Sequence, residues 1–309
     1  MKITALAGGV GASRFLLGLT SVMPPEDVTI IANTGDDIEM FGLRICPDID
    51  TVTYTLAGVI DDRAGWGLRN DTFECLHNLA SYGEDTWFNL GDKDLATHIF
   101  RTNQLRQGSS VSEITLEVCR RLGVRSTILP MTDEYTPTRV TTDDGEMHFQ
   151  EYFVRRRCEP RVRSLRFDGI DSARPAPGVL DAITGADGVV VCPSNPFISI
   201  GPILGVPGVR DALVQTRAKI VAITPIIGGK ALKGPAADML RDLGHEVSAA
   251  SVAAMYRDFL DIFIVDQSDA GLERDVLELG IEARLADTIM SSLEKKKELA
   301  SFVLSAIKA

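Results

Sequence analysis

The sequence has little cysteine and histidine, with five and four residues among 309. The cysteines are scattered and form no Cys-x-x-Cys pair, which suits buried thiols in a reducing cytoplasm. The histidines show no metal-ligand spacing, and we interpret them as structural or surface residues. They are His77, His98, His148 and His245. The sequence also lacks the motif Gly-x-Ser-x-Gly, so it marks no serine as the nucleophile of a Ser-His-Asp triad.

Long apolar runs and an excess of positive charge are absent as well. No run approaches the ~18 apolar residues of a membrane span, and Met1-Lys2 is not followed by a signal peptide's long apolar segment. The formal charge is −11, from 32 Lys and Arg against 43 Asp and Glu. This balance argues against nucleic acid or an anionic membrane as a partner. We expect a cytoplasmic protein with small-molecule ligands.

Short apolar runs with a strand-like composition alternate with helical stretches. The strand-like runs are Ile3–Ala7, Val28–Ala32, Ser126–Leu129, Val189–Cys192, Ile220–Ile223 and Ile262–Val265. Helices are predicted over Ala12–Leu19, Asp71–Ser81, Ser112–Leu122, Gly208–Thr216, Pro235–Leu243 and Asp287–Ile307. This alternation predicts an α/β fold, with a doubly wound, mostly parallel Rossmann-like sheet covered by helices on both faces. We expect residues 1–309 to form one domain.

One segment breaks this pattern. Two strand-like runs, Thr138–Thr142 and Met147–Val154, flank an Asp-Asp-Gly turn at residues 143–145, which is a hairpin signal. We therefore predict a small antiparallel insertion over residues 138–168. Six of its arginines, at positions 155–157, 161, 163 and 166, favour a solvated strand face over contact with an acidic ligand or partner.

Residues 8–13 read Gly-Gly-Val-Gly-Ala-Ser and follow the first apolar run directly. Glycines between a buried strand and a helix let backbone N–H groups approach a phosphate, which the helix N-terminus also attracts. The segment fails the dinucleotide pattern Gly-x-Gly-x-x-Gly, and it lacks the lysine of a P-loop. A phosphate cradle of another class is favoured slightly over a turn without a ligand.

Small and polar residues follow three further strands. They lie at Asn33–Asp37, at Pro193–Pro196 with Ser199–Pro202, and at Thr224–Lys230 with a continuation to Pro235. Ligands of open α/β sheets bind at the carboxyl ends of the strands, so these segments predict one shared site. Lys230, beside Gly228 and Gly229, is suited to a phosphate, although a surface lysine is the alternative.

An acidic group lies between the second strand and the next helix. Asp48 and Asp50 are two residues apart, so in an extended chain both carboxylates point to one side. Paired carboxylates beside a phosphate loop suit Mg²⁺, which takes oxygen ligands. A solvated acidic loop, or a set of helix N-caps, explains the same spacing equally well.

Both tryptophans, Trp66 and Trp87, lie between Gly65 and Ala96, among glycine and polar residues. A flat aromatic ligand would use such a surface. Core tryptophans are the equally weighted alternative.

Together these segments resemble the 2-phospho-L-lactate transferase family, which makes the precursor of the deazaflavin coenzyme F-420. The resemblance runs in order over nearly the whole chain. It is carried by residues 8–16, 33–37, 46–51, 63–67, 87–97, 193–196 and 224–230. It implies transfer from a guanosine diphosphate ester of lactate or enolpyruvate to the terminal ribityl hydroxyl of the deazaflavin Fo. GMP leaves, Mg²⁺ assists, and the enzyme is a homodimer.

The resemblance also implies roles for individual residues. Asp50, Asp48 and Lys93 would be catalytic, and Asp48 and Asp50 would hold the metal. Contacts to Fo are implied for Asp50, Lys93, Asn33, Trp66, Asn89 and Thr51. Contacts to the nucleotide are implied for Gly8, Gly9, Gly11, Ala12, Ser13, Ser194, Asn195, Ser199, Gly201, Gly228, Gly229 and Lys230.

Two other functions fit parts of the pattern. One is another nucleotide-dependent transferase on a similar sheet, which would bind GDP but ignore Fo. The other is a non-catalytic nucleotide-binding regulator of the related YvcK-like group, which shares the glycine loop. The Asp48/Asp50 pair and the block Trp87–Thr97 favour the transferase, since a regulator needs neither a deazaflavin surface nor a metal-bound hydroxyl.

Overall fold

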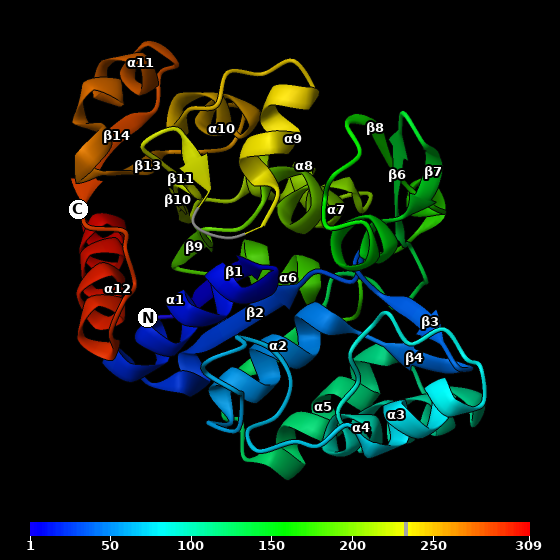
Figure 1. Ribbon diagram of the computed structural model, residues 1–309. Helices are drawn as coiled ribbons and strands as arrows, with labels where there is room; N and C mark the ends of the chain where they lie inside the picture. The colour runs from blue at the N-terminus through cyan, green and yellow to red at the C-terminus, as the bar shows by residue number, and fades with distance from the viewer. Residues whose placement is uncertain (232–233) are drawn as a thin grey trace.

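A seven-stranded parallel sheet runs through the computed structural model, which describes residues 1–231 and 234–309 (Figure 1). The strand order is β14-β13-β10-β9-β1-β2-β5, and every neighbouring pair is parallel. The strands are β1 Ile3–Ala7, β2 Val28–Ala32, β5 Thr127–Pro130, β9 Gly188–Val191, β10 Lys219–Ile223, β13 Ile262–Asp266 and β14 Glu282–Ala286. The predicted doubly wound α/β class is confirmed, and all six predicted strands form.

The seventh strand, β14, was not predicted. Its sequence, Glu-Ala-Arg-Leu-Ala, carries two charged residues and lies at the sheet edge, where no residue of the strand is buried. Central strands are recognised by continuous apolar runs because both of their faces are covered. An edge strand lacks that signal.

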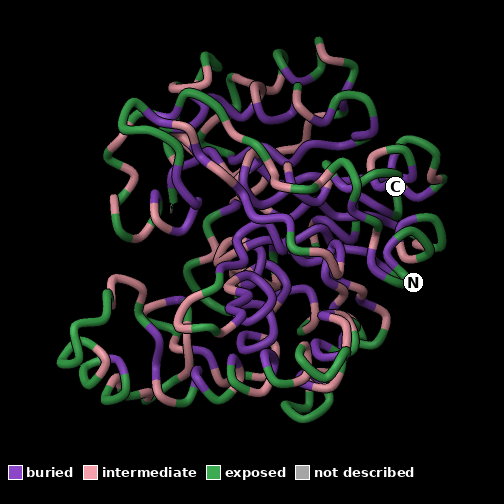
Figure 2. Tube along the Cα trace, turned by 90° about the vertical axis from the view of Figure 1, so that its right-hand side faces the viewer, coloured by how far each residue is buried: buried purple, intermediate pink, exposed green. Residues whose placement is uncertain are grey.

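Helices cover both faces of the sheet, and two apolar cores lie between the layers. One face carries α1 Gly9–Val22, α2 Pro47–Leu56, α5 Val111–Leu122 and α12 Leu293–Lys308. The other carries α6 Val179–Thr184, α7 Gly201–Gly205, α8 Val209–Gln215, α9 Ala236–Asp242, α10 Ala249–Met255 and α11 Glu273–Glu278. Successive residues of a strand point into opposite cores, as Ala5 and Leu6 of β1 do. Figure 2 shows the buried residues concentrated along this central region.

Two helices near the acidic segment, α3 Glu74–Ser81 and α4 Asp92–Arg106, lie beyond α2. The second was not predicted, because the residues it buries include Asp94, His98 and Arg101. These positions have helical spacing, but a search for apolar periodicity misses a stripe made of polar side chains. The helix α5 was predicted, and its N-cap is Ser110, with a capping box to Glu113.

The insertion predicted over residues 138–168 forms a separate antiparallel sheet of order β7-β6-β8. Its strands are β6 Thr138–Thr142, β7 Gly145–His148 and β8 Val162–Phe167. The second predicted strand was too long, since the chain turns into the short helix η2, Glu151–Arg155, after β7. Arginines of the insertion are largely exposed and pair with acidic neighbours, as Arg166 does with Glu146 at 2.8 Å. This agrees with the predicted solvated face.

Shorter elements complete the fold. They are the hairpins β3 Ile38–Met40 with β4 Leu43–Ile45 and β11 Ile226–Ile227 with β12 Lys230–Ala231, and the helical turns η1 Pro25–Asp27, η3 Ile170–Ser172, η4 Pro196–Ile200 and η5 Gln267–Leu272. Leu232 and Lys233, which belong to the predicted loop running to Pro235, lie outside the described residues.

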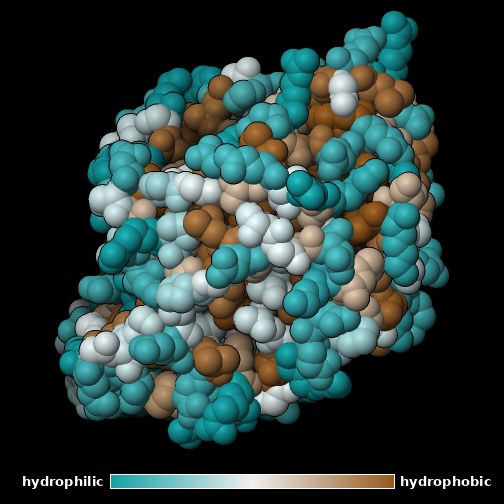
Figure 3. Space-filling model, turned by 180° about the vertical axis from the view of Figure 1, so that it is seen from behind, coloured by the Kyte–Doolittle hydropathy of each residue, from teal (hydrophilic) through white to brown (hydrophobic). Residues whose placement is uncertain are grey.

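The rear surface mixes polar and apolar side chains, with the apolar ones in separate patches (Figure 3). Within residues 1–231 and 234–309, no single helix is long and apolar enough to cross a membrane. One bent pair, Pro196–Gly205 with Val209–Gln215, meets the same test by length and composition only.

Candidate active site

The glycine loop forms the predicted turn from a buried strand into a helix. The strand β1 ends at Ala7, Gly8 caps the helix, and α1 begins at Gly9 with a positive φ of 68°. A Cβ on Gly11 would lie 2.2 Å from the carbonyl oxygen of Pro193, and a Cβ on Gly8 would lie 2.6 Å from Cβ of Ser199. Glycine is therefore required here by close packing against the segment that follows β9.

This packing joins two segments for which the resemblance implies contacts to the nucleotide. The Ser194 hydroxyl donates a hydrogen bond to the Gly8 carbonyl oxygen at 2.8 Å. The side chain of Asn195 accepts from the backbone N–H of Phe197 at 2.9 Å and so caps η4. The carboxyl ends of β1 and β9 thus bring their loops together, as the rule for open sheets predicts.

A cleft of about 570 Å³ opens at this edge of the sheet. Eleven of the candidate residues line it: Gly8, Gly9, Gly11, Asp48, Asp50, Thr51, Trp66, Asn89, Ser194, Asn195 and Ser199. Segments far apart in the sequence therefore converge on one space, which is large enough for a ligand of drug or cofactor size.

The remaining candidates lie around the cleft without lining it in the described structure. Ala12 and Ser13 are buried within α1. Gly201 lies at the junction of η4 and α7. Three more, Gly228, Gly229 and Lys230, are exposed in the β11–β12 hairpin.

Neither Lys93, which is exposed, nor Asn33, which is buried, lines the cleft, and each bonds to a neighbouring group. The Lys93 ammonium donates to the backbone carbonyls of Arg69 and Asn70, at 3.2 and 2.6 Å. It thereby ties α4 to the loop that carries Trp66. The amide of Asn33 is buried and donates to the Asp48 carboxylate at 2.8 Å. Both contacts position residues that do line the cleft.

The expected extended spacing of Asp48 and Asp50 is wrong, because both residues lie in the first turn of α2. Residues two apart on a helix point to different sides, so the two carboxylates have separate surroundings. Asp48 lies beside Asp36, and the Asn33 amide donates to both, at 2.8 and 3.1 Å. Asp50 instead faces α4.

The Asp36/Asp48 pair is buried, and neither carboxylate forms an ion pair with a lysine or arginine among residues 1–231 and 234–309. Burial raises the pKa of Asp48 to about 7, although the hydrogen bond from Asn33 lowers it. Burial, and then the charge of Asp48, raise the pKa of Asp36 well above its usual value. Two buried carboxylates that resist ionising together favour a cation between them. These two residues therefore fit a hard divalent ion.

Asp50 is held by a buried guanidinium from α4. Arg101 Nη1 donates to Oδ2 of Asp50 at 3.0 Å, and Nη2 contacts Oδ1. The same Nη1 lies 3.2 Å from Nδ1 of His98. Since a guanidinium only donates, Nδ1 accepts, and the imidazole proton sits on Nε2. That nitrogen lies 3.4 Å from Oδ1 of Asp94.

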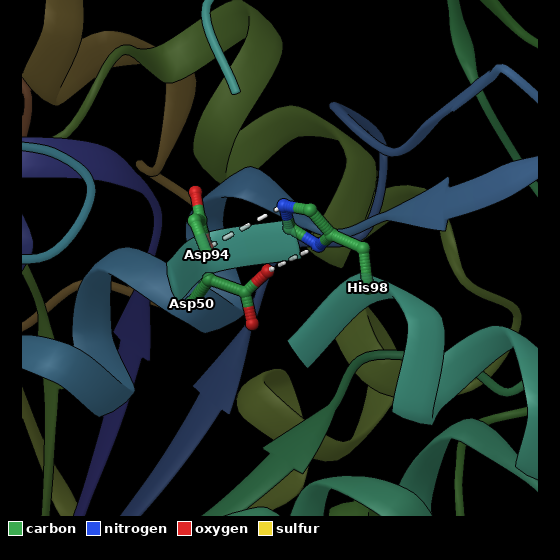
Figure 4. A group of neighbouring side chains, drawn as sticks. All are labelled: Asp50, Asp94 and His98. Carbon is green, nitrogen blue, oxygen red and sulfur yellow. Dashed lines mark ion pairs between the residues drawn. The ribbon is translucent and has the colours of Figure 1, made fainter. Parts of the chain in front are cut away.

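Figure 4 shows His98 between the carboxylates of Asp50 and Asp94, with one ring nitrogen toward each. Asp94 also accepts from the Tyr54 hydroxyl at 2.7 Å. Burial raises the pKa of Asp94, but the donors His98 and Tyr54 outweigh it, so the pKa lies below its usual value. Asp50, Asp94 and His98 bring their ligand atoms within 4.8 Å of one another. Arg101 already supplies a cation there, which makes this group a poorer metal site than Asp36 with Asp48.

Aromatic side chains form another part of the lining. Trp66, Phe88, Phe149 and Phe153 all contribute, and Trp66 is 39% exposed. The rings of Phe149 and Phe153 stack, with centroids 5.5 Å apart and 12° between their planes. Trp87 instead meets Phe88 edge-on at 5.7 Å and packs in a small core. Trp87 therefore packs in a core, whereas Trp66 lies at the cleft and its contact with a flat ligand stays a prediction.

The sequence matches the family described as 2-phospho-L-lactate transferase CofD over residues 3–296. The chain belongs to this family. Among its relatives, the phosphoenolpyruvate transferase of Thermobifida fusca is 45% identical, over 97% of this chain and 96% of the relative. The 2-phospho-L-lactate transferase of Methanosarcina mazei is 40% identical, over 97% and 98%. The resemblance inferred from the motifs is confirmed.

A UPF0052-family protein from Bacillus halodurans has the same fold as this CofD-family chain. The TM-score is 0.68, with 16% sequence identity, and the match covers 98% of each chain. At that identity the likeness concerns the fold alone.

Several lining residues of the CofD-family chain were not singled out from the sequence. Tyr54, His98, Phe149, Gln150 and Phe153 lie outside the segments that carry the resemblance, whereas Arg14, Asp36 and Asp94 lie inside them but received no individual role. His98 was interpreted as structural or surface, and it is buried, but it also lines the cleft. A helical spacing of Asp94, His98 and Arg101 is the one signal that was available.

Proposed function

We propose that the protein transfers a 2-phospholactyl or phosphoenolpyruvyl group from a guanosine diphosphate ester to the terminal hydroxyl of Fo, and releases GMP. The names of its relatives support this reaction class. The observation that carries the proposal is that the cleft joins a glycine loop, buried carboxylates and an aromatic lining. A phosphoryl transfer to a flat aromatic acceptor needs these three parts together.

We assign the binding site of the guanosine diphosphate ester to the loops after β1 and β9. The glycine loop places the first amides of α1 at the cleft, where the helix dipole favours an anion. Ser194, Asn195 and Ser199 adjoin it and offer hydrogen-bonding groups to the rest of the nucleotide. Lys230, in the nearby hairpin, stays a predicted phosphate contact.

We assign Fo to the side of the cleft that is lined by Trp66, Asn89 and the stacked pair Phe149 and Phe153. Flat rings bind against aromatic faces, and the side-chain amide supplies a polar contact. Asp50, fixed by Arg101, is the charged group that we assign to the acceptor end. Thr51 lies beside it and also lines the cleft.

Mg²⁺ fits Asp48 together with Asp36, for the reasons of burial and charge given above. When bound there, it would neutralise negative charge on the diphosphate. Asp50 is a weaker ligand than predicted, because its two oxygens already contact Arg101.

In the proposed reaction the hydroxyl oxygen of Fo attacks the β-phosphorus, and the bond from that phosphorus to GMP breaks. The chain's own residues fix the two reactants, which supplies much of the rate in phosphoryl transfer. Asp94 is placed to accept the hydroxyl proton. Its Oδ1 accepts from the Tyr54 hydroxyl and lies 3.4 Å from Nε2 of His98, whereas Oδ2 makes no hydrogen bond with a described residue.

Titration with Fo, followed by fluorescence with and without GDP and Mg²⁺, tests the proposal. Saturable binding supports it. Absence of Fo binding while GDP still binds would favour the other transferase or the regulator.

Trp66→Leu should weaken Fo binding about tenfold. Tyr82→Leu is the matched control, because Tyr82 is 81% exposed and lies outside the cleft lining. The homodimer and the cytoplasmic location stay predictions.

A further inference from the structure

Arg14 is a half-buried residue of α1 that lines the cleft. It lies one helical turn after Val10, which also lines the cleft, so the two share a face. Long side chains on a helix lean toward its N-terminus. This tendency favours a guanidinium that reaches the cleft near the first turn of α1.

Arg14 makes no hydrogen bond or ion pair with any described residue. Two other arginines near the cleft have carboxylate partners: Arg44 contacts Asp37 at 3.0 Å, and Arg101 is paired with Asp50. The Arg14 guanidinium thus keeps its hydrogen-bonding capacity available to a ligand.

A second cation stands close to Arg14. The helices α1 and α12 meet so closely that a Cβ on Gly18 would lie 2.3 Å from the Lys296 carbonyl oxygen. Burial, and then the charge of Arg14, lower the pKa of Lys296, and the nearby carboxylate of Asp62 offsets this only in part. Two like charges near each other favour an anion that neutralises both.

The rest of the cleft is acidic. Four carboxylates line it: Asp36, Asp48, Asp50 and Asp94. Among the lining residues that the structure describes, Arg14 alone is a lysine or arginine. A diphosphate that enters this cleft meets these carboxylates, of which Asp50 is already paired with Arg101, and the guanidinium of Arg14 offsets the remaining repulsion.

We propose that Arg14 binds the diphosphate of the nucleotide donor, and that Lys296 adds positive charge behind it. The identity of the donor rests on the proposed function, whereas the anion contact does not. A guanidinium matches phosphate oxygens through two parallel N–H bonds, and the amides of the helix N-terminus bind the same group from another side. Arg14 is a binding residue that discriminates phosphorylated from unphosphorylated nucleosides.

The test compares the affinities of GDP and guanosine for the wild-type protein and three variants. Arg14→Gln should weaken GDP binding about 10- to 100-fold, because a charge-assisted hydrogen bond is lost. Its guanosine affinity should not change. Arg14→Lys should fall between, since an ammonium lacks the fork geometry. Arg217→Gln is the control, because Arg217 is exposed and lies away from the cleft lining.

Arg14→Gln would overturn the inference if it bound GDP within about twofold of wild type, the range of an ordinary surface substitution. An equal loss for GDP and guanosine would overturn it as well, because Arg14 would then act on the fold or the nucleoside. Fo binding by the wild-type protein is measured in parallel. Its absence would refute the proposed function and leave the Arg14 comparison intact.

Discussion

Arg101→Gln is expected to destabilise the protein by about 3–5 kcal/mol, the cost of leaving one partner of a buried ion pair alone. The Arg101 side chain is 2% exposed and that of Asp50 is 6% exposed. Asp50 accepts from two guanidinium nitrogens, so the substitution leaves a carboxylate in a low-dielectric site without a counter-charge. His98 loses the donor to its Nδ1 at the same time.

Urea unfolding of wild type, Arg101→Gln, Asp50→Asn and the double variant measures this pair. The double variant leaves no buried charge unpaired, so it should recover much of the loss, with a coupling energy above about 2 kcal/mol. Arg120→Gln is the matched control. Arg120 pairs with Glu117 while 69% exposed, and its loss should cost less than about 1 kcal/mol.

The reasoning would be refuted if Arg101→Gln destabilised the protein no more than Arg120→Gln. It would also be refuted if the losses of the two single variants simply added in the double variant. Either result would mean that Arg101 does not neutralise Asp50 in the folded state. Asp50 would then be as suitable a metal ligand as Asp48.

Three further outcomes are expected. Asp50→Asn should cut turnover sharply and leave GDP binding largely intact, measured by transfer to Fo and by calorimetry; normal turnover would remove Asp50 from the mechanism. Gly11→Ala should weaken both stability and GDP binding, because the new methyl group meets the Pro193 carbonyl at 2.2 Å. The raised pKa of Asp48 contributes stability that is full below the unfolded value of 3.8 and lost as pH rises through about 7. Millimolar Mg²⁺ should therefore raise the melting temperature more at about pH 8 than at about pH 5, and Asp48→Asn should abolish that difference.

The central sheet could be predicted from the sequence because its inner strands are buried on both faces and therefore apolar throughout. The glycine loop was also predictable, since its pattern marks a strand-to-helix turn. The reason for its glycines was not, because Gly11 is constrained by Pro193, a residue 182 positions away in the chain.

The side of the cleft assigned to the acceptor was harder to foresee. The helix α4 buries Asp94, His98 and Arg101, and polar residues carry no apolar periodicity. Their partners Asp50 and Tyr54 belong to α2, about 40 to 50 residues earlier, so the network depends on how two helices pack. Single-sequence patterns report local structure and contain no such pairing.

The three-stranded insertion gives the cleft two parts with different tolerance to change. Phe149, Gln150 and Phe153 line the cleft from outside the main sheet, and Gln150 anchors that segment to the Asp36 carbonyl at 3.2 Å. The glycine loop is fixed by contacts of Gly8 and Gly11 that leave no room for a methyl group, whereas the insertion contributes side chains to the cleft lining. Under the proposed function, substitutions in the insertion would change the preference for the aromatic acceptor and leave the backbone of the glycine loop in place.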